Sequence, residues 1–78
     1  MDFDFYISDR KHKKYMVKVE NKWIHFGDKR YEHYKDQLGS YSHLDHMNPK
    51  RRKNYKKRHE NTRHKKYSAS WFADQILW

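Results

Sequence analysis

A shortage of aliphatic side chains limits what this chain can fold into. Ile, Leu, Val and Phe together make up only 12 of its 78 residues, whereas there are seven Tyr and three Trp. A chain of this length is near the lower limit for a domain that folds on its own core. Large aromatic side chains bury much area at a low entropic cost. We therefore expect one domain, residues 1–78, with a thin aromatic core and modest stability.

Alternating apolar and polar residues over 14–26 predict a β-hairpin with its turn at Glu20–Asn21, where Asn21 tolerates a positive φ. One face of the hairpin would carry Tyr15, Val17, Val19, Ile24 and Phe26. The other face would carry Lys14, Met16, Lys18, Trp23 and His25. Phe3, Phe5 and Ile7 alternate with polar residues in the same way. Residues 1–12 are therefore expected to form either a third, edge strand or a flexible N-terminus.

Capping signals predict the helices. Asp28 is suited to begin a helix that runs to about Leu38, and Asn48-Pro49 is suited to begin one over about 49–60. Ser68 or Ser70 would cap a last helix, whose wide apolar face packs on the hairpin. Residues 40–47 and 61–67 are expected to be loops. The chain is therefore predicted to be α+β, with an N-terminal hairpin, or three strands, packed against two or three short helices.

The positive charge is concentrated in one stretch. The formal net charge is +9, and ten of the 19 Lys and Arg lie between residues 50 and 66, opposed there only by Glu60. Such a run repels itself unless an anion lies nearby. The predicted phosphate contacts are Lys50, Arg51, Arg52, Lys53, Lys56, Lys57, Arg58, Arg63, Lys65 and Lys66. Lys14 and Lys18 would extend this surface if the polar face of the hairpin lay alongside it.

Aromatic residues are interleaved with these cations, at Tyr41, Tyr55, Tyr67 and Trp71. Aromatic side chains beside Arg and Lys can stack on exposed bases. A chain so short of aliphatic residues also needs them in its core. Core packing is the favoured interpretation for all four, most clearly for Tyr55 and Trp71.

No enzyme motif stands out, and we expect neither catalysis nor a metal or other cofactor. The chain has no Cys, which excludes disulfides and thiolate zinc sites. His43-Leu44-Asp45-His46 imitates part of an HNH nuclease site, but the predicted strands precede it instead of flanking it, and no second acidic ligand follows. Asp45 is instead expected to pair with Arg51 or Arg52. No apolar stretch approaches the roughly 20 residues that span a bilayer, so we expect a soluble protein without a membrane partner.

Four segments resemble a family of small, basic, uncharacterised proteins of large DNA viruses, notably algal viruses and their relatives. These are KKYMVKV, WIHFGDKRYEHYKD (which contains HFGD), HLDHMNPKRRKNYKKRH and SASWFADQILW, and together they cover roughly residues 13–78. The resemblance implies a viral origin and a late or virion-associated role, in the virion or the host cell interior. It assigns no activity to particular residues.

The leading functional expectation is non-specific nucleic-acid binding, of DNA more than RNA and of duplex DNA in particular, in genome packaging or organisation. Lys and Arg neutralise phosphates and release counterions, which gives affinity without base preference. The alternative is a structural virion protein, a minor capsid or cement component, that docks on an acidic protein surface. Dependence on salt separates the two, because a protein interface anchored by aromatic residues loses less affinity as salt rises.

Overall fold

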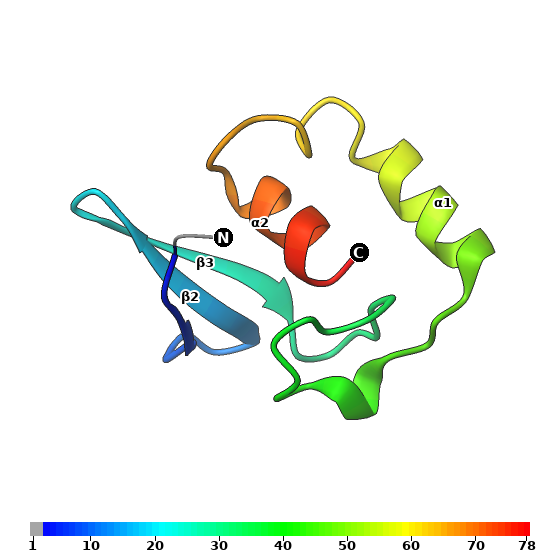
Figure 1. The fold of residues 1–78 in the computed structure, drawn as a ribbon, viewed down its shortest axis with the longest axis horizontal. Helices are drawn as coiled ribbons and strands as arrows, with labels where there is room; N and C mark the ends of the chain where they lie inside the picture. The colour runs from blue at the N-terminus through cyan, green and yellow to red at the C-terminus, as the bar shows by residue number, and fades with distance from the viewer. Residues whose placement is uncertain (1–2) are drawn as a thin grey trace.

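The computed structural model describes residues 3–78 and shows a three-stranded antiparallel sheet, an irregular segment and two α-helices (Figure 1). The strands are β1 (Phe5–Ile7), β2 (Lys13–Val19) and β3 (Lys22–Asp28), in the order β1-β2-β3. A short 3₁₀ helix, η1 (Ser42–Leu44), precedes α1 (Pro49–Arg58) and α2 (Ala69–Ile76). The α+β prediction is confirmed, and residues 1–2 of the predicted domain lie outside the described part. No helix in the described part is both long and apolar enough to cross a membrane.

The predicted hairpin is confirmed in its register. Tyr15 pairs with Phe26 and Val19 with Lys22, so the turn falls at Glu20–Asn21. The left-handed backbone is taken by Glu20, with φ 57°, and not by Asn21 as predicted. β1 pairs antiparallel with β2 as an edge strand. The alternating pattern therefore predicted both the sheet and its inner face.

The core is aromatic, as the composition predicted. α2 lies across the inner face of the sheet (Figure 1), and Phe72 is fully buried there against the rings of Phe5 and Phe26. Ser68 is the N-cap, because its Oγ accepts a hydrogen bond from the Trp71 N–H at 3.1 Å. The last helix thus packs on the hairpin as expected.

Residues 28–38 do not form the predicted helix, and this prediction was wrong. Side-chain carboxylates satisfy the backbone of this segment instead: Asp36 accepts from the N–H groups of Leu38 and Tyr41, and Asp45 accepts from the Asp36 N–H, each at 2.8 Å. Asp28 binds Arg30 and caps no helix. Short polar side chains that bond to nearby backbone compete with helix formation, and here they prevail over an apparent helical spacing.

A buried polar network fixes the same segment to the sheet. Lys14 is only 2% exposed, and its Nζ donates to the Tyr31 carbonyl at 2.9 Å and to His33 Nδ1 at 2.8 Å. His33 Nε2 then donates to Asp45 Oδ1 at 2.5 Å. Because an ammonium only donates and a carboxylate only accepts, this arrangement defines a neutral His33. Burial lowers the pKa of His33, and the charge of Lys14 lowers it further.

This network corrects two predictions. Lys14 does not extend a cationic surface, since it is buried under the segment that carries His33. Asp45 does not pair with Arg51 or Arg52, since its carboxylate is held by His33 and by the Asp36 N–H.

Gly27 lets the strand end pack against α2. Its φ is +76°, and a Cβ there would lie 2.8 Å from Leu77 Cδ1 and 3.1 Å from Lys14 Cβ. We expect Gly27→Ala to lower the free energy of unfolding by about 2 kcal/mol, from backbone strain and the clash together. Gly39→Ala is the matched control, because Gly39 also has a positive φ, +93°, but open space around it. Urea denaturation of both variants checks this, and equal losses would contradict it.

Candidate nucleic-acid interface

The helix that carries most of the predicted cations is set by local signals. Asn48 is its N-cap, with Oδ1 accepting from the N–H groups of Lys50 at 3.0 Å and Arg51 at 3.2 Å, and Pro49 occupies the first helical position. Basic residues in the last turn complement the helix dipole. The predicted start is confirmed, and the helix ends at Arg58, slightly before the expected residue 60.

α1 is held to the rest of the protein along one row of side chains. Tyr55 is buried, and its ring stacks on Trp78 with centroids 4.1 Å apart and planes 3° from parallel. On either side of it, Arg52 Nε donates to the Trp78 carbonyl at 2.7 Å and Lys56 Nζ pairs with Asp74 at 2.8 Å. Figure 1 shows α1 standing apart from the sheet. Much of the surface of α1 therefore remains open.

The structure gives four of the ten predicted phosphate contacts partners within the protein. Arg51 pairs with Glu32 at 2.8 Å, and Arg63 lies 3.1 Å from Glu60 and 3.7 Å from Asp74. The Arg52 guanidinium also lies over the Tyr34 ring, 5.0 Å from its centroid. The four residues with partners are Arg51, Arg52, Lys56 and Arg63. A phosphate would have to displace an existing contact to reach them.

The other six predicted contacts are exposed, and their side chains have no ion-pair or hydrogen-bond partner within residues 3–78. They are Lys50, Lys53, Lys57, Arg58, Lys65 and Lys66. The first three are spaced by three and four residues, so they share the face of α1 opposite Tyr55. We call Lys50, Lys53 and Lys57 the outward stripe. Its three charges are left to solvent or to a partner, as is that of Arg58, which lies on another side of α1.

The remaining predicted residues lie elsewhere. Lys18 is exposed but lies near the hairpin turn, at the far end of the molecule from α1 (Figure 1), with its Nζ 5.9 Å from the Trp23 ring centroid. It therefore does not extend the α1 surface. Trp71, Tyr41 and Tyr67 pack on the core: Trp71 lies edge-on to Phe72, Tyr41 lies edge-on to Tyr15, and Tyr67 contacts Phe72 while staying partly exposed.

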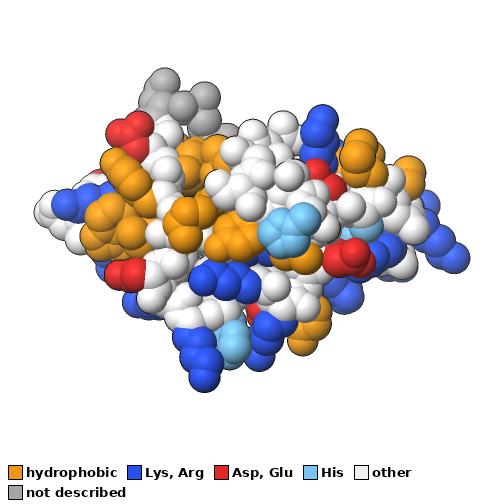
Figure 2. All heavy atoms as spheres, turned by 90° about the horizontal axis from the view of Figure 1, so that it is seen from below, with side chains coloured by type: hydrophobic (Ala, Val, Ile, Leu, Met, Phe, Trp, Pro, Cys, Tyr) orange, Lys and Arg blue, Asp and Glu red, His pale blue; other side chains and the backbone are white. Residues whose placement is uncertain are grey.

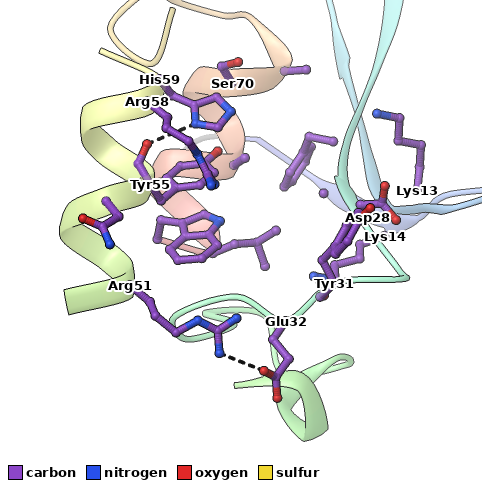
Figure 3. A pocket seen from close by; sticks show the side chains of 17 residues that line it. Lys13, Lys14, Asp28, Tyr31, Glu32, Arg51, Tyr55, Arg58, His59 and Ser70 are labelled. Carbon is purple, nitrogen blue, oxygen red and sulfur yellow. Dashed lines mark hydrogen bonds and ion pairs between the residues drawn. The ribbon is translucent and has the colours of Figure 1, made fainter. Parts of the chain in front are cut away.

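Sequence reasoning missed a cleft between α1 and the body of the protein (Figure 3). It has a volume of about 660 Å³. Its lining includes apolar residues from β3 and α2, aromatic rings, and cations from β2 and α1, among them Phe26, Ala73, Leu77, Trp78, Tyr31, Tyr55, Lys13, Arg51 and Arg58. These residues are distant in sequence, so no local pattern could have indicated the cleft.

The histidine and acidic residues are not arranged as a metal site in the part of the chain that is described. No group of three or more His, Asp or Glu side chains among residues 3–78 could hold a metal ion. Asp45, the acidic residue of the HNH-like sequence, is bound to His33 and the Asp36 N–H.

The chain matches a protein-family model. A family model described as "Family of unknown function (DUF5754)" matches residues 3–59. The matched range includes the sheet, the irregular segment and all of α1, and ends before α2. No curated protein and no solved structure matches the chain.

Proposed function

We propose a function for this chain, which belongs to the DUF5754 family of unknown function: it binds nucleic acid through the outward stripe of α1. Binding is non-specific, favours DNA over RNA, and engages duplex DNA in packaging or organising a genome. The proposal rests on one observation: some cations of α1 have partners within the described part of the protein and others do not. Those that hold the helix in place have partners, whereas Lys50, Lys53 and Lys57 are exposed and have none among residues 3–78.

The geometry of α1 supports this function. A ten-residue helix is about 15 Å long, and a helix attached along one row of side chains can approach a groove or a phosphate backbone with its free face. Lysine side chains act as flexible point charges. They neutralise phosphates without reading base edges, which favours sequence-independent binding. Lys65 and Lys66, which are also exposed, would add contacts beyond the helix.

The resemblance to proteins of large DNA viruses supports the proposed setting. A basic protein that neutralises phosphates would act where a viral genome is condensed, in the virion or inside the host cell. No membrane partner, metal or catalytic step is part of this proposal.

The test compares two triple variants that remove the same charge from the same helix. We expect Lys50→Gln, Lys53→Gln and Lys57→Gln together to weaken duplex binding about tenfold to thirtyfold at 0.1 M salt. They should also reduce the slope of log affinity against log salt by about 3, because about one counterion is released per neutralised phosphate. Fluorescence anisotropy with a labelled duplex at several salt concentrations measures both.

The matched control is Arg51→Gln, Arg52→Gln and Lys56→Gln, which removes three cations that already have partners. Its folding is verified by circular dichroism before titration. We expect a smaller change in the salt slope for this variant than for the first. Undiminished duplex binding by the outward-stripe variant would refute the proposed interface.

A second candidate function, a structural virion protein, is favoured by the outer face of the sheet. Tyr6 and Trp23 are each about half exposed there, with ring centroids 5.9 Å apart, and Figure 2 shows hydrophobic side chains gathered over the sheet end of the molecule. Aromatic residues are enriched at protein interfaces. Binding to an acidic virion protein that persists at high salt and is lost in Trp23→Ala would support this function over the first.

A further inference from the structure

The cleft between α1 and the body is large enough for a ligand and is apolar at its base. Its volume of about 660 Å³ lies within the range of roughly 300–1,000 Å³ typical of small-molecule sites. Phe26 and Leu77 are fully buried and line it together with Ala73. Gly27 also lines the cleft, where its backbone packs closely against Leu77. The base of the cleft therefore suits an apolar group.

Aromatic rings stand on two sides of the cleft. On the helical side, Tyr55 and Trp78 stack in parallel, and Tyr55 is further covered by His59 with centroids 4.1 Å apart. On the opposite side, Tyr31 is 64% exposed, although it carries a large ring, and Figure 3 places it across the cleft from Tyr55. Both faces of Tyr55 are covered, so Tyr31 is the ring on which a base can stack, and an aromatic ring accepts any base because every base has a π-face.

The charge at the mouth of the cleft favours an anionic ligand. Its two acidic residues are already matched: Asp28 pairs with Arg30 and Glu32 pairs with Arg51, each at 2.8 Å. Arg30 lowers the pKa of Asp28 to about 2, which keeps this ion pair intact at neutral pH. Arg58 lines the cleft with no ion-pair partner within the described residues.

A second cation faces Arg58. Lys13, from β2, lines the opposite side of the mouth (Figure 3). Arg58, the last residue of α1, is turned about 100° around the helix axis from Lys57, so the cleft and the outward stripe lie on different sides of α1. A nucleic-acid strand on the stripe would reach the cleft by passing around the C-terminal end of α1.

We propose that the cleft binds one unpaired nucleotide, with its base against Tyr31 and the apolar base of the cleft and its phosphate on Arg58. The inference rests on the proposed function and deepens it: the outward stripe holds the backbone, and the cleft adds affinity for strands that offer an unpaired base. Duplexes with a single-nucleotide gap or flap should then bind more tightly than fully paired duplexes of equal length and charge.

The test uses thymidine 5′-monophosphate as the probe and the backbone amides of the ¹⁵N-labelled protein as the readout. We expect saturable shifts at Gly27, Ala73 and Leu77, which inorganic phosphate alone does not produce. Arg58→Gln should weaken this binding about tenfold, the loss of one charge-assisted contact. Lys57→Gln is the matched control, because it removes the neighbouring cation on the stripe, which does not line the cleft.

The outcomes separate this inference from the proposed function. Duplex binding that depends on the outward stripe, with no shift of the three cleft amides by the nucleotide, would overturn the inference and leave the function intact. Equal loss of nucleotide binding in Arg58→Gln and Lys57→Gln would also overturn it. Shifts produced instead by an acidic peptide with one aromatic residue, and not by the nucleotide, would assign the cleft to a protein partner. Duplex binding that the outward-stripe variant leaves unchanged would count against the proposed function itself.

Discussion

Asp45→Ala is expected to lower the free energy of unfolding by about 2–4 kcal/mol, the cost of leaving two buried donors without their acceptor. The Asp45 carboxylate accepts from His33 Nε2 and from the Asp36 N–H. Without it, both donors lose their partner, and the buried Lys14 ammonium loses a nearby negative charge. A domain of 78 residues has a total stability of only about 4–12 kcal/mol. The variant is therefore expected to be partly unfolded at 37 °C.

Urea denaturation followed by tryptophan fluorescence and circular dichroism measures this loss. Asp45→Asn should fall between the variant and the wild type, because its amide oxygen still accepts a hydrogen bond but carries no charge. Asp4→Ala, at an exposed position, is the control for a change in net charge. A loss below about 1 kcal/mol in Asp45→Ala would show that the network does not stabilise the irregular segment.

Elements whose signals are local could be predicted from the sequence. The turn at Glu20–Asn21, the Asn48 cap of α1 and the Ser68 cap of α2 each depend on contacts within a few residues. The inner face of the sheet follows from strict alternation. These features place the cationic helix after the sheet and leave most of its side chains in water.

Features decided by distant partners could not be predicted in this way. The spacing of Tyr31, Tyr34 and Leu38 suggests a helix, but the backbone there bonds to carboxylates that lie up to nine residues away. Lys14 reads as a surface residue of a strand, yet its partner His33 lies 19 residues later. The alternating pattern contains no information about either contact.

Contacts between residues distant in sequence also decide which cations of α1 have partners within the protein. Arg51 pairs with Glu32, which is 19 residues away in the sequence, and Lys56 pairs with Asp74, which is 18 residues away. A count of positive charge between residues 50 and 66 cannot separate these from Lys50, Lys53 and Lys57. Only the fold shows which cations position the helix and which remain for a partner.

Stability is expected to rise as the pH rises from 8 to 10, by about 2 kcal/mol, because of Lys14. Burial lowers the pKa of Lys14 from 10.5 to about 8, against the raising effect of the nearby carboxylates. Between pH 8 and pH 10.5 the unfolded chain therefore holds a proton on Lys14 that the folded protein has released. Because the unfolded state binds more protons in this window, raising the pH favours the folded state.

Above pH 10 the free energy of unfolding stops rising with pH because of the buried tyrosines. Burial raises the pKa of Tyr15, and it raises the pKa of Tyr55 to about 12. Above pH 10 the unfolded chain loses these protons first, so stability is expected to fall again. The wild-type profile should therefore have a maximum near pH 10.

Lys14→Met isolates the contribution of Lys14, because methionine fills similar space without a charge. We expect its stability to lack the rise between pH 8 and pH 10. At pH 7 the variant no longer carries the cost of a buried ammonium, but it leaves the Tyr31 carbonyl and His33 Nδ1 without their donor, so the pH dependence and not the stability at pH 7 is the readout. Urea denaturation of both proteins at half-unit pH intervals gives the difference directly. A parallel rise in both proteins would show that the pH dependence comes from groups other than Lys14, and that the buried ammonium is less costly than its position among Tyr31, His33 and Gly27 implies.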